Sequence, residues 1–237
     1  MAMEDLTGSL PAYAKDLKLN YSSLVKQNTE LTPQQLWGTV VAAAIATRNP
    51  ELTAASIAEA EAAGLNADAI DAIKAASAIM GMNNIYYRFH HLTTNEKYAT
   101  LPARLRMNAL RGHKVNHVDF ELWCLVVSAV NACEKCVDSH ERVLRDKGAT
   151  EELINAAIRV TAVVHAIGVV LDSEKAAPTS APPVCGTMAS WIRSIPAWPS
   201  AWESAPPTTH LFPTRILASS GCDESYVLET QAFSHSG

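Results

Sequence analysis

Apolar residues recur at helical spacing along most of this chain. Thr32 and Pro33 precede one such segment, Asn66 precedes a second, and Thr150 precedes a third. Spacings of three and four residues put side chains on one helix face, and Ser, Thr, Asn and Pro are typical of helix starts. No alternating strand pattern competes. The pattern predicts an all-α fold to about residue 173, with buried stripes of Leu36, Val40, Ala43 and Ala44, then Ile70, Ile73, Ala76, Ile79 and Met80, then Leu153, Ala156, Val160 and Val164.

The helical pattern also occurs twice. Residues 35–46 match residues 121–132 in their Leu-Trp and Val-Val pairs, and each copy then reaches a glycine before another apolar helix. Self-similarity of this kind predicts a duplicated helical unit, with copies at about residues 30–92 and 117–173. In this alignment Gln35, Thr47 and Pro50 stand opposite Glu121, Cys133 and Cys136. The acid and the two thiols are therefore special to the second copy.

The composition changes near residue 176. Residues 176–237 are rich in proline and serine and show no steady period. We expect residues 1–175 to form the helical domain and residues 176–237 to be an irregular extension, disordered or unrelated to activity.

Composition and charge narrow the class of protein. The chain has 237 residues, 48% of them hydrophobic, and a net charge of −5, which argues against a nucleic-acid partner. The first residues lack the basic and apolar regions of a secretory signal, and the apolar run at 160–171 is short for a bilayer. Five cysteines with one close pair suit a reducing compartment. We expect a cytoplasmic protein with no membrane segment.

The close pair is Cys133 and Cys136, which are three residues apart and can close a small disulfide ring. His140 lies one helical turn after Cys136, on the same face. On one unbroken helix Glu121 would be roughly 18 Å from Cys133, at about 1.5 Å per residue. A turn near Asn131 would instead give two antiparallel helices and bring the side chains of Glu121 and His140 together. The order acid, imidazole, thiol is the arrangement that activates nucleophiles.

Other interpretations of these residues remain open. Cys133, Cys136 and His140 could hold zinc with Glu121 or His165 as a fourth ligand, although the close cysteine pair is equally typical of redox chemistry. Cys124, amid apolar neighbours, reads as a small buried hydrophobe.

The motif Glu-x11-Cys-x2-Cys-x3-His, in a duplicated helical chain with the run Ala-Ile-Met-Gly-Met-Asn-Asn at 78–84, resembles the alkyl hydroperoxide reductase D proteins of the carboxymuconolactone decarboxylase-like superfamily. The likeness covers about residues 1–173. It implies an all-helical, homotrimeric antioxidant thiol peroxidase that binds no cofactor. It also implies partners: organic hydroperoxides, a peroxiredoxin of the alkyl hydroperoxide reductase C type, and a dihydrolipoyl group as reductant, carried by a lipoylated acyltransferase that dihydrolipoamide dehydrogenase recharges.

The resemblance also implies roles for the site residues. Cys136 would attack the peroxide and become a sulfenic acid, and Cys133 would be the resolving thiol and proton donor. Glu121 and His140 would form the proton relay. Lys135 stands where family members carry histidine, and its ammonium can stabilise a nearby thiolate but relays protons poorly.

Two rival functions follow from the same residues. Lys135 favours a dithiol electron carrier that reduces a peroxiredoxin and has little peroxidase activity of its own. A redox-sensing or zinc-binding module would show bound metal, or one slow oxidation without turnover.

Overall fold

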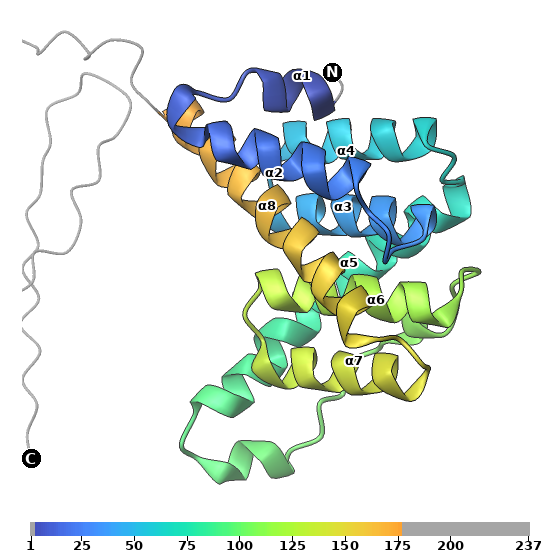
Figure 1. Ribbon diagram of the computed structural model, residues 1–237. Helices are drawn as coiled ribbons and strands as arrows, with labels where there is room; N and C mark the ends of the chain where they lie inside the picture. Colours follow the sequence, from blue (N-terminus) through green and yellow to red (C-terminus); the bar gives the residue numbers. More distant parts are fainter. Residues whose placement is uncertain (1–2, 177–237) are drawn as a thin grey trace, which may run out of the picture. The chain divides into compact units, whose positions relative to one another are not determined.

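Helices alone build residues 3–176, the part of the chain that this computed structural model describes (Figure 1). No strand occurs within these residues, so the all-α prediction is confirmed. The long elements are α1 (Met3–Gly8), α2 (Lys15–Lys26), α3 (Pro33–Thr47), α4 (Pro50–Ala62), α5 (Ala67–Leu92), α6 (His117–Val130), α7 (Glu134–Asp146) and α8 (Glu151–Ala176). Short 3-10 turns lie at η1 (Ala12–Ala14), η2 (Glu96–Thr100) and η3 (Asn108–Leu110). Apart from Ala176, the expected extension at 176–237 lies outside the described residues.

The helices begin where polar side chains can accept orphan amide protons. Thr32 and Gln35 form a reciprocal capping box at α3, with Oγ1 accepting from the Gln35 amide at 3.2 Å and Oε1 accepting from the Thr32 amide at 3.1 Å. Asn49 and Asn66 cap α4 and α5 more simply, because each side-chain oxygen accepts one backbone amide hydrogen bond without a reciprocal partner. Local sequence chemistry therefore sets these boundaries before any tertiary packing is considered.

Helices α3 and α6 pack against each other at the centre of the unit, and α5 and α8 cover them. Their middle segments, 38–44 and 122–128, are buried on every side. Where the two helices meet, the Asp119 carboxylate accepts from the side-chain amides of Gln34 and Gln35 at 2.6 and 2.9 Å. Its two oxygens thus have partners at a place where an unpaired charge would be costly.

The two copies are visible as two matching sets of three helices, α3–α4–α5 and α6–α7–α8, which are called triplets below. Helices α4 and α7 each have 13 residues, and α5 and α8 each have 26. A left-handed residue follows α3 in one triplet and α6 in the other, Arg48 with φ 66° and Ala132 with φ 53°. The next residue caps the following helix, Asn49 in one copy and Cys133 in the other. Pairing the triplets in this register also aligns their buried and exposed positions from 34–50 with 118–134.

This register corrects the alignment made from the sequence. Asn49 and Leu52, rather than Thr47 and Pro50, occupy the positions of Cys133 and Cys136, a shift of two residues. The two Leu-Trp motifs gave the wrong alignment because they do not occupy equivalent structural positions. Trp123 is fully buried, whereas Trp37 is only partly buried. The register between the two copies is set by the positions of the turn and cap residues. Short apolar motifs in helices that are buried on all sides do not set it.

Helix α8 is longer than the run at 160–171 suggested. Among the described helices it alone passes a test of length and hydropathy for a membrane span, with a mean hydropathy of 1.8 over its best window. It nevertheless packs along α2, α3 and α6, and Val160, Val164 and Ile167 belong to the core. These contacts are those of a core helix.

We predict that Gly38→Ala destabilises the fold by about 1–3 kcal/mol, the usual cost of overpacking. A Cβ on Gly38 would overlap the indole ring of buried Trp123, which has no room to move. The matched control is Gly81→Ala on α5, where a Cβ meets nothing within 4 Å and where removing a helical glycine stabilises by about 0.5–1 kcal/mol. Urea unfolding of both variants checks this, and equal shifts in midpoint would contradict it.

Candidate functional site: a disulfide beside a carboxylate–imidazole pair

The chain reverses direction between α6 and α7, as the sequence predicts. Helix α6 ends at Val130, Ala132 adopts its left-handed conformation, and α7 begins at Glu134. The Cys133 amide donates to the Ser128 carbonyl at 3.1 Å, which closes the turn. Cys133 is therefore the N-cap of α7, at the positive end of its dipole.

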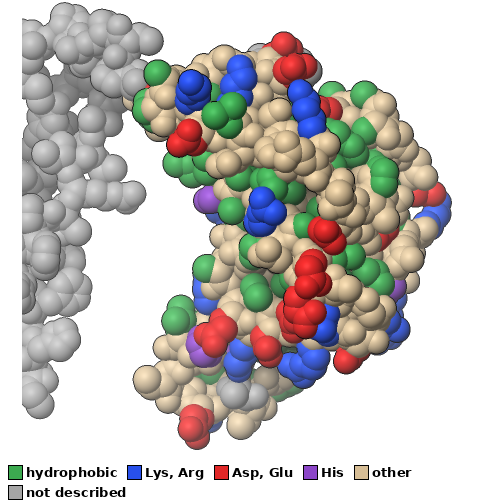
Figure 2. Space-filling view, in the orientation of Figure 1, with side chains coloured by type: hydrophobic (Ala, Val, Ile, Leu, Met, Phe, Trp, Pro, Cys, Tyr) green, Lys and Arg blue, Asp and Glu red, His purple; other side chains and the backbone are tan. Residues whose placement is uncertain are grey.

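Cys133 and Cys136 are joined by a disulfide, with their Cα atoms 5.3 Å apart. Cys133 is fully buried and Cys136 is 6% exposed. An open surface depression lies beside Cys133, which lines it together with Ala132, Glu134, Lys135, Val137, Asp138 and Glu141, whereas Cys136 does not line it. Around α7 the visible face carries acidic and basic side chains side by side (Figure 2). A ligand therefore approaches the dithiol over a surface of mixed charge.

Glu121 and His140 meet across the two antiparallel helices. His140 Nδ1 lies 2.7 Å from Glu121 Oε2, and each side chain is 14% exposed. An ionised carboxylate can only accept a hydrogen bond, so Nδ1–H donates to Glu121 and Nε2 of the neutral imidazole is left as the proton acceptor. The geometry expected for an oriented base is present, and its catalytic role remains a prediction.

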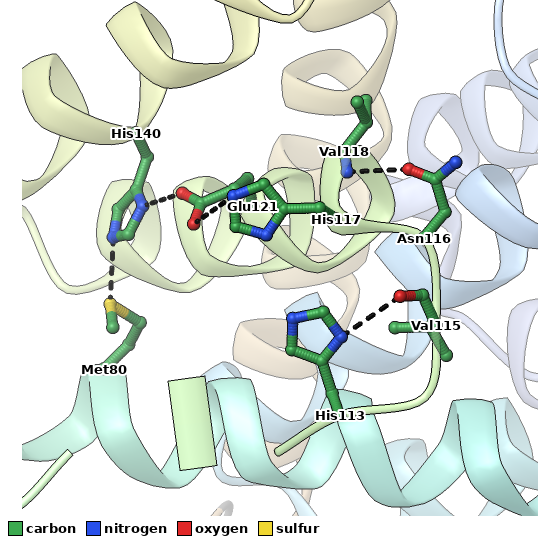
Figure 3. A network of polar contacts seen from close by, with 8 residues as sticks. All are labelled: Met80, His113, Val115, Asn116, His117, Val118, Glu121 and His140. Atoms are coloured by element: carbon green, nitrogen blue, oxygen red, sulfur yellow. Dashed lines mark hydrogen bonds and ion pairs between the residues drawn. The ribbon is translucent and has the colours of Figure 1, made fainter. Parts of the chain in front are cut away.

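Two further side chains complete this network, and sequence reasoning missed both. The sulfur of Met80, on α5, lies 3.2 Å from His140 Nε2. On the other side of the carboxylate, His117 Nε2 lies 3.7 Å from Glu121 Oε1, with its side chain 49% exposed. Figure 3 shows His117 and His140 flanking Glu121, with Met80 at the far nitrogen of His140. The spacing of His117 and Glu121 by four residues was a signal that could have been used.

His140 is thus oriented, but in the disulfide form its free nitrogen meets a thioether. Within residues 3–176, no hydrogen bond joins His140 to either cysteine. The expected pairing of His140 with Cys136 is therefore absent from this disulfide form, and for the reduced protein it stays a prediction.

Of the remaining candidates, Lys135 lies at the dithiol and His165 does not. Lys135 is exposed at the edge of the depression. His165 lies on an exposed part of α8 beside Thr47, at 3.2 Å from its hydroxyl, and not at the dithiol. In the described part of the chain, no group of three or more His, Cys, Asp or Glu side chains has the geometry to hold a metal ion.

Cys124 is fully buried on α6, as its apolar neighbours predicted. Burial, and then the negative charge of Glu121, raise the pKa of its thiol well above the ordinary value. It is thereby distinguished from the paired cysteines as an unreactive core residue.

Comparison with known proteins places this arrangement among relatives. The model of the carboxymuconolactone decarboxylase family matches residues 96–177. The alkyl hydroperoxide reductase AhpD of Acidobacterium capsulatum is 65% identical, over 74% of this chain and 95% of its own. The proteins of the same name from Solibacter usitatus and Koribacter versatilis are 56% and 57% identical, over 73% and 74% of this chain and 97% and 90% of their own.

We predict that iodoacetamide leaves Cys124 unmodified in the native protein and modifies it in denaturant, because burial closes access and holds the thiol protonated. Cys133 and Cys136 should react only after reduction. Peptide mass spectrometry with and without reductant reads all three positions. Labelling of Cys124 at equal rates in native and denatured protein would show that α6 opens readily.

Proposed function

This chain belongs to the alkyl hydroperoxide reductase AhpD family, and we propose that it is an antioxidant oxidoreductase that reduces alkyl hydroperoxides through its Cys133–Cys136 dithiol. The observation that carries the proposal is the oriented Glu121–His140 pair at 2.7 Å, held across the turn that bears the disulfide. The high identity over nearly the whole length of the relatives supports the general activity.

In the proposed reaction His140 Nε2 takes the proton of the reduced Cys136 thiol, and Glu121 stabilises the imidazolium. The Cys136 thiolate attacks the terminal peroxide oxygen, the O–O bond breaks, and the leaving alkoxide takes a proton supplied by Cys133 to become the alcohol. Cys136 is now a sulfenic acid. The Cys133 thiolate attacks its sulfur and forms the disulfide, and the expelled hydroxide takes the proton held by His140 and leaves as water.

Regeneration needs a two-electron donor, and we propose a dihydrolipoyl group. One of its thiolates attacks the Cys133–Cys136 disulfide, and its second thiol closes the lipoyl disulfide and frees both cysteines. A lipoylated acyltransferase with dihydrolipoamide dehydrogenase would supply this dithiol, and a peroxiredoxin of the alkyl hydroperoxide reductase C type would be a second acceptor. Assembly as a homotrimer and a cytoplasmic location belong to the same proposal.

Lys135 supports a second candidate function. It is exposed between the two cysteines, where the family resemblance implies histidine, and an ammonium ion stabilises a thiolate without relaying its proton. A dithiol electron carrier for a peroxiredoxin needs disulfide exchange more than it needs fast peroxide chemistry. The two functions differ in their oxidant, so rates with an alkyl hydroperoxide and with an oxidised peroxiredoxin separate them.

We predict that hydroperoxide consumption with dihydrolipoamide as donor disappears in Cys136→Ser and persists in Cys124→Ala, which removes a thiol outside the site. Lys135→His should raise turnover by roughly tenfold or more, because a positioned acid–base group contributes about 10²–10⁴-fold. Steady-state peroxide assays check all three.

A wild-type protein that consumes no hydroperoxide but exchanges its disulfide with an oxidised peroxiredoxin would favour the electron carrier. Turnover that survives in Cys136→Ser would overturn the assignment of the attacking thiol.

A further inference from the structure

The long helix of each copy braces the turn of the other copy. Helix α5 packs on α6 and α7, and α8 packs on α3. In the structural register, Arg88 of α5 and Asp172 of α8 are equivalent, because each lies four residues before the end of its 26-residue helix. These two positions carry opposite charges and contact equivalent turns. The duplication therefore supplies an internal comparison for the dithiol turn.

At the dithiol turn, a chain of polar contacts, called the polar ladder below, connects α5 to the end of α6. Arg88 Nη1 donates to the Asn131 carbonyl at 2.5 Å, and the Asn131 side-chain amide donates to Asn84 Oδ1 at 3.0 Å. The Asn84 amide in turn donates to the Ser128 hydroxyl at 3.0 Å. Asn84 is buried and Arg88 is partly buried. Two residues of α5, one helical turn apart, thus hold the α6 end of the chain reversal that carries Cys133.

At the turn of the first copy the ladder is different. Asp172 accepts from the side-chain amide of Asn49 at 2.7 Å, and Gly168 stands where α5 has Asn84. Asn49 occupies the position of Cys133. An anion therefore braces the turn without thiols, and a cation braces the turn with them.

The charge matters because of where α6 ends. Asn131 is the C-cap of α6, so its carbonyl is one of the orphan acceptors at the negative end of that helix dipole. This negative end points at the turn just before Cys133 and disfavours a thiolate there. The Arg88 guanidinium neutralises it, while the positive N-terminus of α7 favours ionisation from the other side.

Most other charged groups around the turn are already paired. Glu134, from α7, is 2.7 Å from His91 of α5, and the equivalent of His91 is Lys175, which pairs with Glu51 at 2.6 Å. Asp138 pairs with Arg142 at 3.0 Å, and Glu121 pairs with His140. Exposed Lys135 and half-buried Glu141 remain at the depression with opposite charges. The reversal from Asp172 to Arg88 is thus the change that distinguishes the brace of the dithiol turn.

We propose that Arg88 is a positioning residue of the dithiol: it holds the α6–α7 turn through the Asn131 carbonyl and supplies the positive charge that favours the reactive thiolate of the reduced form. The inference deepens the proposed function, since it assigns a thiolate-promoting role, but its test uses no peroxide. A failure of peroxidase activity would therefore leave its outcome unaffected.

The test compares Arg88→Gln, Arg88→Lys and the matched control Asp172→Asn, each in the full-length reduced protein. Iodoacetamide alkylation is followed across pH by peptide mass spectrometry. Trypsin cuts after Lys135, so Cys136 falls in the peptide Cys136–Arg142, apart from Cys133. Alkylation of Cys136 at pH 7 should slow by about three- to tenfold in Arg88→Gln, with its pH midpoint moved upward by about half to one unit. Arg88→Lys should stay within about twofold of wild type, as should Asp172→Asn.

A merely structural brace would lower thermal stability in Arg88→Gln and leave the alkylation profile unchanged, which would overturn the proposal. If Arg88→Gln does not fold, the Arg88→Lys variant decides the question. Lysine keeps the positive charge, so Cys136 alkylation that is about three- to tenfold slower in a folded Arg88→Lys variant would show that this charge does not promote the thiolate. Slowing of equal size in Asp172→Asn would also overturn it, because the effect would then not belong to the dithiol turn.

Discussion

The reversal of the chain at Asn131–Ala132 is the constraint on which the site depends. It turns α7 back along α6, so that Glu121 and His140, 19 positions apart, come within 2.7 Å. It also makes Cys133 the cap of α7 and lets Cys136 reach it within one helical turn. Ala132 takes a left-handed conformation that costs a non-glycine residue roughly 1 kcal/mol or more, so the surrounding contacts must hold it in place. The contacts from α5 are among those that do.

Duplication explains how one fold supplies both a scaffold and a reactive site. The two helix triplets share the lengths of their second and third helices, their left-handed turn residues and their burial, and α3 and α6 meet at the centre. Each turn is braced by the long helix of the other copy. Because the scaffold functions are shared, side chains at equivalent positions are free to diverge: Asn49 caps a helix where Cys133 forms a disulfide, and Ser56 bonds its own helix where His140 meets Glu121.

Sequence patterns predicted the helices, the turn near Asn131 and the encounter of Glu121 with His140, because caps, periodicity and helix rise act locally. They misplaced the repeat register by two residues, because Leu-Trp words recur in two helices that are buried on all sides and carry no positional signal there. Met80 and His117 were not predicted as neighbours of the Glu121–His140 pair. Met80 belongs to another helix, and the position of His117 has meaning only once Glu121 is known to be part of the site.

The sequence by itself determined the helical class, the helix starts and the set of reactive side chains, since capping and spacing depend on residues a few positions apart. Only the tertiary structure decided which other helix contacts each of these residues. The packing of α5 against α6 and α7 places a thioether at His140 Nε2 and makes Arg88, rather than an acid, the brace of the dithiol turn. Such contacts join residues 40 or more positions apart, and no local pattern records them.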